Sequence, residues 1–560
     1  MSNGRNLEMV NWGNYGLVVI DESHNFRNNN SFTGKENRYQ RLMRKVMQEG
    51  IETKVLMLSA TPVNNRFNDL RNQLALAYEG EAANIDSKLE TEKGVDLIFR
   101  QAQQAFNTWS RLDVQERTTQ RLLDMLDFDF FEILDSLTIA RSRKHITQYY
   151  DTTDIGRFPQ RNTPVSIQSP LTKDDKITYA EIADKLTLLN LSIYSPLNYI
   201  LNSRIAHYAQ LYDKTVKSGT FKQIDREKSL LVLMRINLLK RLESSVDSFR
   251  ITLEGIIMQI EAALRTIEKG TSSDYEGFQA NVDSEEFDWE AEWGDEENVI
   301  GKKIKVHVSD IDTHRWKEDL SADLSILHSL WSGVVDVRGK EDYKLQKLIQ
   351  LLDDKISSPF NPDNRKAIIF TAFADTANYL YENVQQYLKD KYNISTALIT
   401  GSAKTCNTKS IPAELNTLLT CFSPLSKDKE LLYPKIKDSI DLLIATDCIS
   451  EGQNLQDCDF LINYDIHWNP VRIIQRFGRI DRIGSKNETI TMVNFWPDVT
   501  LDSYINLKQR VENRMLISNM ASTGDDNILN TDEKDLEYRK DPITKIDGGS
   551  DRPGRSQRRC

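Results

Sequence analysis

Short apolar runs that end in polar residues constrain the fold of this chain more than any other feature. Two lie near its start, Leu17–Ile20 and Lys54–Leu58. Further runs follow later, and these are Ala367–Phe370, Thr396–Thr400, Asp441–Thr446, Phe460–Tyr464 and Ile490–Phe495. Short runs that are apolar throughout are typical of parallel strands buried on both faces. Because helical stretches separate several of them, the sequence predicts an α/β fold with two parallel-sheet units.

The residues between the two sets of strands are predicted to be mostly helical. Residues Lys228–Val246 carry apolar side chains at spacings of three and four, which is typical of a helix packed in a core or against another helix. Residues 271–300 are acidic and poor in aliphatic side chains, which favours a flexible insert. The alternative to a solvated linker is a segment in which Trp289 and Trp293 anchor a partner protein.

Four regions follow from these patterns. Residues 1–150 form a first, incomplete α/β unit, and residues 151–335 form a helical insertion that contains the acidic segment 271–300. Residues 336–500 form a second α/β unit. Residues 501–560 form a polar tail, which its composition predicts to be largely disordered.

Composition excludes several classes of protein. The formal net charge is −11, whereas a protein that coats DNA non-specifically is usually basic, although a local basic groove stays compatible with this total. The five cysteines form no CxxC pair, which favours reduced thiols in a cytoplasmic protein. No apolar run approaches the roughly 18 residues of a membrane span, and the first ten residues lack the apolar core of a signal peptide, so we expect no membrane association.

An acidic pair, Asp21 and Glu22, directly follows the first strand. Ligands bind at the carboxyl ends of strands in open α/β sheets. Nucleotide hydrolysis needs one carboxylate for Mg²⁺ and a second group that orients the attacking water, so we expect Asp21 to hold the metal and Glu22 the water. Ser59 and Thr61 follow the next strand, where their hydroxyls can hydrogen-bond this pair and report its state. The alternative is an ordinary strand that meets its loop.

An arginine array lies between Tyr464 and Ser485, in the sequence QRFGRIDR. Arg479 and Arg482 are three residues apart, hence on one face if the segment is helical. Guanidinium groups at that spacing suit bidentate contact with phosphate oxygens, and arginines can stabilise the charge that develops during phosphoryl transfer. We therefore expect Gln475, Arg479 and Arg482 to contact a nucleotide. The alternative is a solvated basic helix end.

Small and hydroxyl residues stand at the ends of several later strands. Gly452, in the loop after the strand that ends at Thr446, permits close approach of the backbone to a nucleotide or a nucleic acid. Backbone amides and hydroxyls at such ends can grip phosphates without reading bases. The residues predicted to couple the sites or to contact nucleic acid are Ser59, Thr61, Thr371, Thr400, Gly401, Thr446 and Asn454.

Taken in order, the segments DESH, SAT, TDCISEGQNLQ and QRFGRIDRIG resemble the motifs of superfamily-two helicases. DIHWNP, RIDRIGS and TPVNN are more similar to the Swi/Snf-related branch, including bacterial RNA-polymerase-recycling ATPases, than to unwinding DEAD-box enzymes. The resemblance covers residues 10–75 and about 345–500. Ile139–Lys144 resembles the basic segment that ends the first lobe in this family.

The resemblance implies two RecA-like lobes that bind ATP and Mg²⁺ between them, with a large helical insertion separating the lobes in the sequence. Asp21 and Glu22 would come from one lobe, and Arg479 and Arg482 from the other, as the catalytic residues. The cofactor-binding residues implied are Asp21, Glu22, Gly452, Gln475, Arg479 and Arg482. Hydrolysis would then move the protein along double-stranded DNA.

The chain departs from the family in one respect. Family members have a glycine-rich loop ending in Gly-Lys-Ser/Thr upstream of the DESH strand, where it holds the phosphates, and no segment of this sequence matches that loop. Gly34-Lys35, Gly301-Lys302 and Gly339-Lys340 do not fit, because none is followed by Ser or Thr. We expect a first lobe without its opening strand, loop and helix, in a truncated chain or one half of a split gene. Such a chain would be inactive alone and would need an N-terminal partner polypeptide. A non-enzymatic nucleic-acid or RNA-polymerase-binding module and an RNA-directed helicase stay open as alternatives.

Overall fold

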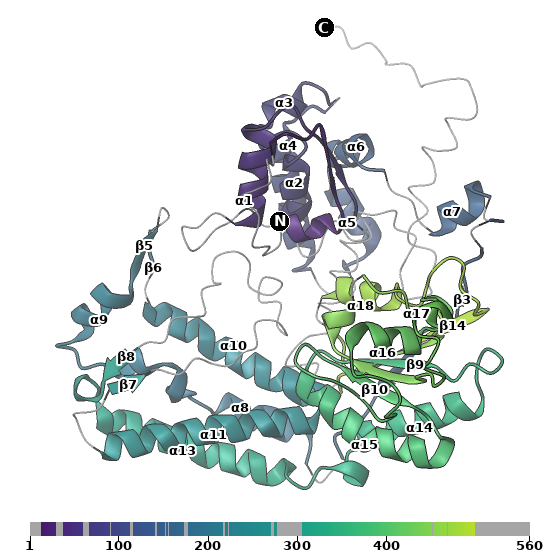
Figure 1. Cartoon of the computed structure of the whole chain (residues 1–560). Helices are drawn as coiled ribbons and strands as arrows, with labels where there is room; N and C mark the ends of the chain where they lie inside the picture. Colours follow the sequence, from purple (N-terminus) through teal and green to yellow (C-terminus); the bar gives the residue numbers. More distant parts are fainter. Residues whose placement is uncertain are drawn as a thin grey trace. The chain divides into compact units, whose positions relative to one another are not determined.

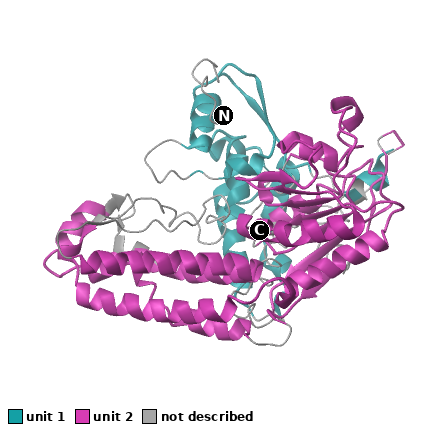
Figure 2. Ribbon diagram, turned by 60° about the horizontal axis from the view of Figure 1, so that its bottom comes forward, with its two compact units in different colours: residues 1–151, 515–560 teal, residues 152–514 magenta. Residues whose placement is uncertain are grey.

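The computed structural model describes residues 13–498 with internal gaps. The gaps are residues 28, 30–36, 60–66, 90, 113–115, 140–142, 152, 155, 173–176, 217–218, 222, 270–273, 277–304, 451 and 468. Contacts divide the chain into two compact units, residues 1–151 with 515–560 and residues 152–514 (Figure 2). The predicted polar tail, Trp289, Trp293 and Thr61 lie outside the described residues.

The first unit begins with a pair of parallel strands, β1 (Leu17–Ile20) and β2 (Lys54–Met57), in which Leu17 pairs with Lys54. Helix α1 (Arg38–Leu42) and the π-helical turn η3 (Met43–Gln48) connect them. Their apolar side chains pack against Ile20 in one buried cluster, so this helical segment covers one face of the strand pair. The sequence predicted this strand, helix and strand.

The opposite face of the β1–β2 pair is exposed. Leu17 and Val19 of β1 are 57% and 54% exposed, and Leu56 and Leu58 at β2 are 50% and 45% exposed. Side chains alternate between the faces of a strand, so these four leave the same side of the pair. None of the residues that the structure describes buries this apolar surface.

The rest of the first unit is helical, as expected for residues 85–150. Phe67, Phe99 and Phe130 are completely buried and meet edge to face, and they form the centre of a second apolar cluster. Such T-shaped contacts are the preferred geometry of aromatic pairs. The helices are α2 (Phe67–Ala75), α3 (Ala83–Asp86), α4 (Val95–Trp109), α5 (Thr119–Met125), α6 (Phe128–Leu137) and α7 (Arg143–Tyr149).

The second unit contains a mainly helical region, residues 179–334, which we call the helical arm. Helices α10 (Gln223–Ser244) and α11 (Val246–Glu268) are separated by Ser245 alone, whose hydroxyl caps α11 by accepting from the Ser248 amide at 3.1 Å. Helix α13 (Thr313–Val334) lies alongside α11 (Figure 1). Leu238 and Leu242 of α10 are buried, which confirms the predicted packing role of this apolar stripe.

Shorter elements complete the arm. Within the segment predicted to be flexible, Asp274–Glu276 form strand β7, which pairs with β8 (Lys305–His307). The other elements are α8 (Tyr179–Thr187), α9 (Ile205–Tyr212), β5 (Lys214–Val216), β6 (Gly219–Phe221) and the 3-10 turns η5 (Ser192–Tyr194), η6 (Pro196–Tyr199) and η7 (Val308–Asp310).

A mostly parallel sheet forms the centre of the second unit, with strands in the order β11-β10-β12-β9-β13-β14-β3 (Figure 1). Every residue of β9, β10, β12 and β13 is buried, so both faces of the sheet are covered. The prediction of an α/β fold with a parallel sheet is therefore confirmed. The strands are β3 (Gln160–Arg161), β4 (Val165–Gln168), which also pairs with β14, β9 (Ala367–Phe370), β10 (Thr396–Ile399), the antiparallel β11 (Lys404–Cys406), β12 (Leu442–Ala445), β13 (Phe460–Asn463) and β14 (Thr489–Trp496).

Helices α14 (Tyr343–Ser357) and α15 (Ala374–Tyr392) pack on this sheet in one buried apolar cluster. The side chain of Lys355 in α14 is completely buried, and its Nζ lies 2.7 Å from Asp459 Oδ1. Asn361 donates to the same carboxylate at 2.7 Å. The remaining elements are η8 (Gly339–Glu341), α16 (Leu415–Phe422), α17 (Lys429–Leu432), η9 (Asp447–Ile449) and α18 (Pro470–Phe477).

We predict that Lys355→Met destabilises the second unit, because it leaves the Asp459 carboxylate buried without its cation. Breaking a buried ion pair costs roughly 3–5 kcal/mol, which lowers the thermal midpoint of a domain this size by ~6–15 °C. Differential scanning fluorimetry measures the midpoint. Lys347→Met on the same helix is the control, since Lys347 Nζ donates to the exposed Gln350 side chain at 3.0 Å and not to a buried carboxylate. Equal midpoints for the two variants would contradict the structural role of the buried pair.

Candidate functional site

The carboxyl ends of the parallel strands define the candidate site in the second unit. The chain leaves β9 through α15 towards β10 and leaves β13 through α18 towards β14, so neighbouring strands β9 and β13 send their connections in opposite directions. Such a switch point is where open α/β sheets bind ligands. Thr371, Thr446 and Asp465 stand at or just beyond these strand ends.

The helical arm fills this switch point. Asp465 Oδ2 accepts hydrogen bonds from Thr371 Oγ1 and from Ser244 Oγ, both at 2.5 Å, and Asp465 Oδ1 accepts from the Ala372 amide at 2.8 Å. Ser244 ends α10 and is completely buried. Thr371 was expected to contact or report on nucleic acid. The structure instead places its hydroxyl in a buried contact between the sheet and the arm.

A buried carboxyl lies beside this network. Burial raises the pKa of Glu243 to about 8, although the charge of Lys344, whose Nζ is 3.9 Å away, opposes the shift and Asp465 adds to it. Glu243 Oε1 has no hydrogen-bond partner among the described residues. Neither Glu243 nor Asp465 was identified from the sequence. The signals were the Ser-Ser break in a long helical pattern and the Asp that follows the β13 run.

We predict that the second unit becomes less stable as the pH rises from 5 to 8. In this window folded Glu243 holds a proton that the unfolded chain, with a pKa near 4.5, has lost, so deprotonation favours unfolding. Each pKa unit is worth about 1.4 kcal/mol. Glu243→Gln should flatten the fall in thermal midpoint across these pH values, while Glu261→Gln on α11 should keep the wild-type slope. An unchanged slope in Glu243→Gln would contradict the raised pKa.

Arg476 belongs to the predicted array but is completely buried. Its guanidinium donates to both carboxylate oxygens of Asp447, at 2.6 and 2.7 Å, and to Asn463 Oδ1 at 3.0 Å, and it lies over the Phe370 ring. Burial raises the pKa of the Asp447 carboxyl, but the charge and hydrogen bonds of Arg476 outweigh it, so the pKa lies below its usual value. Arg476 therefore ties the loop after β12 to α18.

Arg479 and Arg482 follow α18, which ends at Phe477, so they lie in a turn and not within the helix. Arg479 donates from Nε to the Gln475 carbonyl at 3.0 Å and from Nη1 to the Gln453 carbonyl at 3.2 Å. Arg482 Nε donates to the Gly478 carbonyl at 3.1 Å and remains partly exposed. Gln475 itself is buried.

The loop after β12 meets this turn. Gly452 has a φ of +70°, in the left-handed region that favours glycine, and an added Cβ would meet open space. The Leu455 amide donates to the Arg479 carbonyl at 3.0 Å, so the loop and the arginine turn are joined. In the described part of the chain, Asn454 Oδ1 is buried without a hydrogen-bond partner.

The other predicted strand-end residues serve local turns. Thr400 Oγ1 accepts from the Ala403 amide at 2.9 Å, which closes the turn that contains Gly401. Thr446 Oγ1 donates to Cys448 Sγ at 3.5 Å. Neither of these two hydrogen bonds involves Arg479 or Arg482.

In the first unit, the acidic pair stands where β1 ends. Asp21 Oδ1 accepts from the Glu22 amide at 2.9 Å, and Glu22 is in the left-handed region with a φ of 49°. Strained residues of this kind cluster at functional sites. His24 Nδ1 lies 3.3 Å from Glu22 Oε2 and 3.3 Å from Ser59 Oγ, so His24 links Ser59 to the acidic pair. No role was predicted for His24 from the sequence, although it belongs to the DESH segment.

The acidic pair fits a magnesium ion of the nucleotide-bound kind. In the described part of the chain, no group of three or more His, Cys, Asp and Glu side chains could hold a metal by itself. Mg²⁺ in nucleotide sites usually keeps waters and uses one or two carboxylates plus the phosphates of the substrate. Asp21, which is exposed, matches that donor set.

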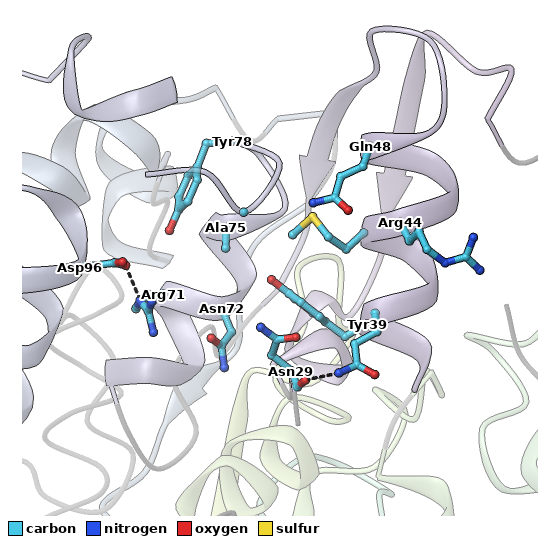
Figure 3. Close-up of a pocket in the computed structure, with 12 residues that line it drawn as sticks. Asn29, Tyr39, Arg44, Gln48, Arg71, Asn72, Ala75, Tyr78 and Asp96 are labelled. Atoms are coloured by element: carbon cyan, nitrogen blue, oxygen red, sulfur yellow. Dashed lines mark hydrogen bonds and ion pairs between the residues drawn. The ribbon is translucent and has the colours of Figure 1, made fainter. Parts of the chain in front are cut away.

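A cavity of about 400 Å³ lies elsewhere in the first unit, between η3 and α2 (Figure 3). The hydroxyl of the buried Tyr39 has no hydrogen-bond partner in the described structure, and burial raises its pKa. Arg71 donates to Asp96 at 2.7 Å, so this cation is already neutralised. No residue predicted to act on a nucleotide lines the cavity. It is lined by Asn29, Tyr39, Gln40, Met43, Arg44, Gln48, Arg71, Asn72, Ala75, Tyr78, Gly80 and Asp96.

Comparison with known proteins assigns the sheet of the second unit. Residues 343–484 match the helicase conserved C-terminal domain. These residues are therefore similar to the C-terminal domain of helicases. This domain contains Gln475, Arg479 and Arg482 as well as the Gly452 loop.

Named relatives agree with this domain. The chain is 30% identical over 179 residues to an uncharacterized ATP-dependent helicase, YqhH, of Bacillus subtilis, which covers 32% of the chain and 25% of that protein. It is 34% identical over 79 residues to the RNA polymerase-associated protein RapA of Vibrio campbellii, covering 14% and 8%. The matched region thus spans a quarter or less of these two relatives. Domain and relatives together support a helicase of superfamily two.

A solved structure, the Hef helicase domain of Pyrococcus furiosus, aligns with 88% of this chain and with 73% of the solved chain, at 13% identity and with a TM-score of 0.37.

Among the helices of the described residues, none combines the length and the apolar composition that crossing a membrane requires.

Proposed function

We propose that this chain belongs to an ATP-driven translocase that moves along double-stranded DNA. The observation that carries the proposal is the helicase C-terminal domain, because Arg479 and Arg482 lie in it beside the glycine loop at the carboxyl edge of its sheet. Arg476 is neutralised by Asp447, whereas Arg479 and Arg482 both donate hydrogen bonds to backbone carbonyls of this edge. We propose these two guanidinium groups for charge stabilisation during phosphoryl transfer.

The acidic pair of the first unit has the chemistry that a magnesium ion and a hydrolytic water require. Asp21 would hold Mg²⁺, and Glu22 would orient the water that attacks the terminal phosphate of ATP. His24 holds Glu22 in place and connects it to Ser59, which supports a route from the nucleotide to the following segment. Bound ATP and Mg²⁺ supply the reacting phosphate and its neutralising charge.

We propose that this chain belongs to the Swi/Snf-related branch of superfamily two. The similarity to RNA polymerase-associated RapA supports it, as do the DIHWNP and RIDRIGS segments. We therefore propose duplex DNA as the track. A cytoplasmic location is proposed too, since Cys406, Cys421, Cys448 and Cys458 form no disulfide in the structure.

A further polypeptide segment is proposed to supply the phosphate-binding loop, because Gly-Lys-Ser/Thr occurs nowhere in the 560 residues. The exposed apolar face at Leu17, Val19, Leu56 and Leu58 supports this proposal, since strands of α/β sheets are normally covered on both faces. This segment is either part of a longer chain or a separate partner.

We predict little ATP hydrolysis by the 560-residue chain alone, with or without duplex DNA. Adding a polypeptide that carries the opening strand, Gly-Lys-Ser/Thr loop and helix of a superfamily-two helicase should raise hydrolysis. Glu22→Gln should abolish the restored activity, and Arg479→Ala should lower it by roughly a thousandfold. A coupled phosphate-release assay measures the rate, and Arg338→Ala is the control because Arg338 lies outside the described site.

Brisk DNA-stimulated hydrolysis by the chain alone, abolished by Glu22→Gln, would refute the need for the added segment. Failure of every added segment to restore hydrolysis would favour the alternative of a non-enzymatic nucleic-acid or polymerase-binding module.

The track is tested separately with the restored enzyme. We predict that it displaces the third strand of a DNA triplex without separating an RNA duplex, because a duplex tracker pushes bound strands aside and does not unpair its own track. Gel separation of the labelled strands measures both reactions in parallel. RNA unwinding without triplex displacement would favour the RNA-directed helicase.

A further inference from the structure

The cavity of about 400 Å³ in the first unit has no part in the proposed reaction, yet it contains a buried polar group without a partner. Tyr39 is only 3% exposed, and its hydroxyl has no hydrogen-bond partner among the described residues. Figure 3 shows this hydroxyl pointing from α1 towards α2, while Tyr78 reaches the same space from the opposite side. An unpaired buried hydroxyl destabilises a fold, and a bound molecule that hydrogen-bonds to it removes that cost.

The charged side chains among the described lining residues are paired. Arg71 Nε donates to Asp96 Oδ1 at 2.7 Å. Arg44 Nη1 donates to both carboxylate oxygens of Glu49 at 2.9 Å. Burial raises the pKa of both cavity tyrosines, for Tyr78 to about 12, so the phenols keep their protons at neutral pH. The lining therefore offers no unbalanced charge, which favours an uncharged ligand.

Two side-chain amides determine which hydrogen bonds a ligand must make. Asn72 Nδ2 donates to the Arg27 carbonyl at 2.7 Å. Gln48 Nε2 donates to the Glu79 carbonyl at 3.1 Å. A carbonyl oxygen only accepts, so each amide faces it with nitrogen and offers its own oxygen, an acceptor, elsewhere. Both residues line the cavity, so a ligand that uses these oxygens has to donate hydrogen bonds.

The rest of the lining suits a flat molecule that is partly apolar. Tyr39 and Tyr78 contribute rings, Met43 a thioether and Ala75 a methyl group. Proteins recognise unstacked nucleobases by stacking on aromatic side chains and by hydrogen bonds along the edges of the base. The exocyclic amino group of adenine or cytosine is a donor, as the amide oxygens require. The cavity volume lies within the range of small-molecule pockets, about 300–1,000 Å³.

We propose that this cavity, with Tyr39, Gln48, Asn72 and Tyr78, is a binding site for a nucleobase that carries an amino group, as in adenosine or cytidine. The Tyr39 hydroxyl donates to a ring nitrogen of the base, and the oxygens of Gln48 and Asn72 supply acceptors for the amino group. The base comes from a free nucleoside or from an unstacked nucleotide of a nucleic-acid strand, which share this chemistry. Neither residue of the acidic pair lines the cavity, so the site is independent of the proposed function.

Nucleoside binding to the 560-residue chain tests the site. Adenosine and inosine are a matched pair, because inosine has an oxygen where adenosine has its amino group. Saturation-transfer NMR titrations measure both affinities for wild type and for Tyr39→Phe. Tyr15→Phe, at an exposed tyrosine of the same unit, is the control. Differential scanning fluorimetry confirms that each variant is folded and gives its thermal midpoint.

Adenosine should bind wild type roughly tenfold more tightly than inosine, since inosine places an acceptor opposite the amide oxygens. Tyr39→Phe should weaken adenosine binding by roughly tenfold without lowering the thermal midpoint, because it removes a hydroxyl that is unpaired in the free protein. Tyr15→Phe should behave as wild type. A purely structural role of Tyr39 predicts the reverse, a lower midpoint with unchanged affinity.

A single-stranded adenine oligonucleotide, added as a competitor, distinguishes the two sources of the base. If it displaces adenosine from wild type but not from Tyr39→Phe, the base belongs to a nucleic-acid strand. If it displaces adenosine from neither, the ligand is a free nucleoside. Both results support the site and differ only in the source of its ligand.

The proposal is overturned if adenosine does not bind at millimolar concentration, which leaves the cavity to water, or if inosine binds equally well. Equal affinity of wild type and Tyr39→Phe for adenosine would place the nucleoside elsewhere, which ends this inference and leaves the proposed function untouched. Should Tyr39→Phe not fold, Gln48→Met removes an acceptor oxygen and keeps the length of the side chain. It should reduce the preference for adenosine over inosine, and an unchanged preference would equally overturn the proposal.

Discussion

The bidentate ion pair between Arg476 and Asp447 is the interaction on which the candidate site depends. It joins the loop after β12 to helix α18 inside the sheet's carboxyl edge, with both oxygens of the carboxylate used. A buried arginine is tolerated only when its charge is matched, and Asp447 with Asn463 provides that match. Because the pair holds the loop and the helix together, the Gly452 loop and the turn at Arg479 share one rigid support.

The helical arm joins the same edge through a second set of buried polar groups. The last turn of α10 places Ser244 on Asp465, which also binds Thr371 at the end of β9. The switch point of the sheet, where a ligand would otherwise enter, is therefore occupied by the chain itself. This displaces the candidate ligand site towards β12 and the turn after α18.

The sequence was sufficient for β1, β2, β9, β10, β12, β13 and β14 because their apolar runs are short, complete and separated by helical spacing. It was not sufficient for the sheet strands β3, β4 and β11, which lack such runs. It also located the acidic pair and the arginines, since strand ends bring such residues to one edge. It did not distinguish the roles of Arg476, Arg479 and Arg482, because burial and partners depend on residues far away, such as Asp447. The positions of Ser244 and Glu243 were not predictable for the same reason: each acts through contacts across more than twenty residues of sequence.

Arg476 and Arg482 belong to one arginine-rich segment but differ in the charge of their partners. A guanidinium with a carboxylate partner has little to gain from a phosphate, whereas one bonded only to neutral groups gains a full charge interaction. Arg476 is in the first state and Arg482 in the second.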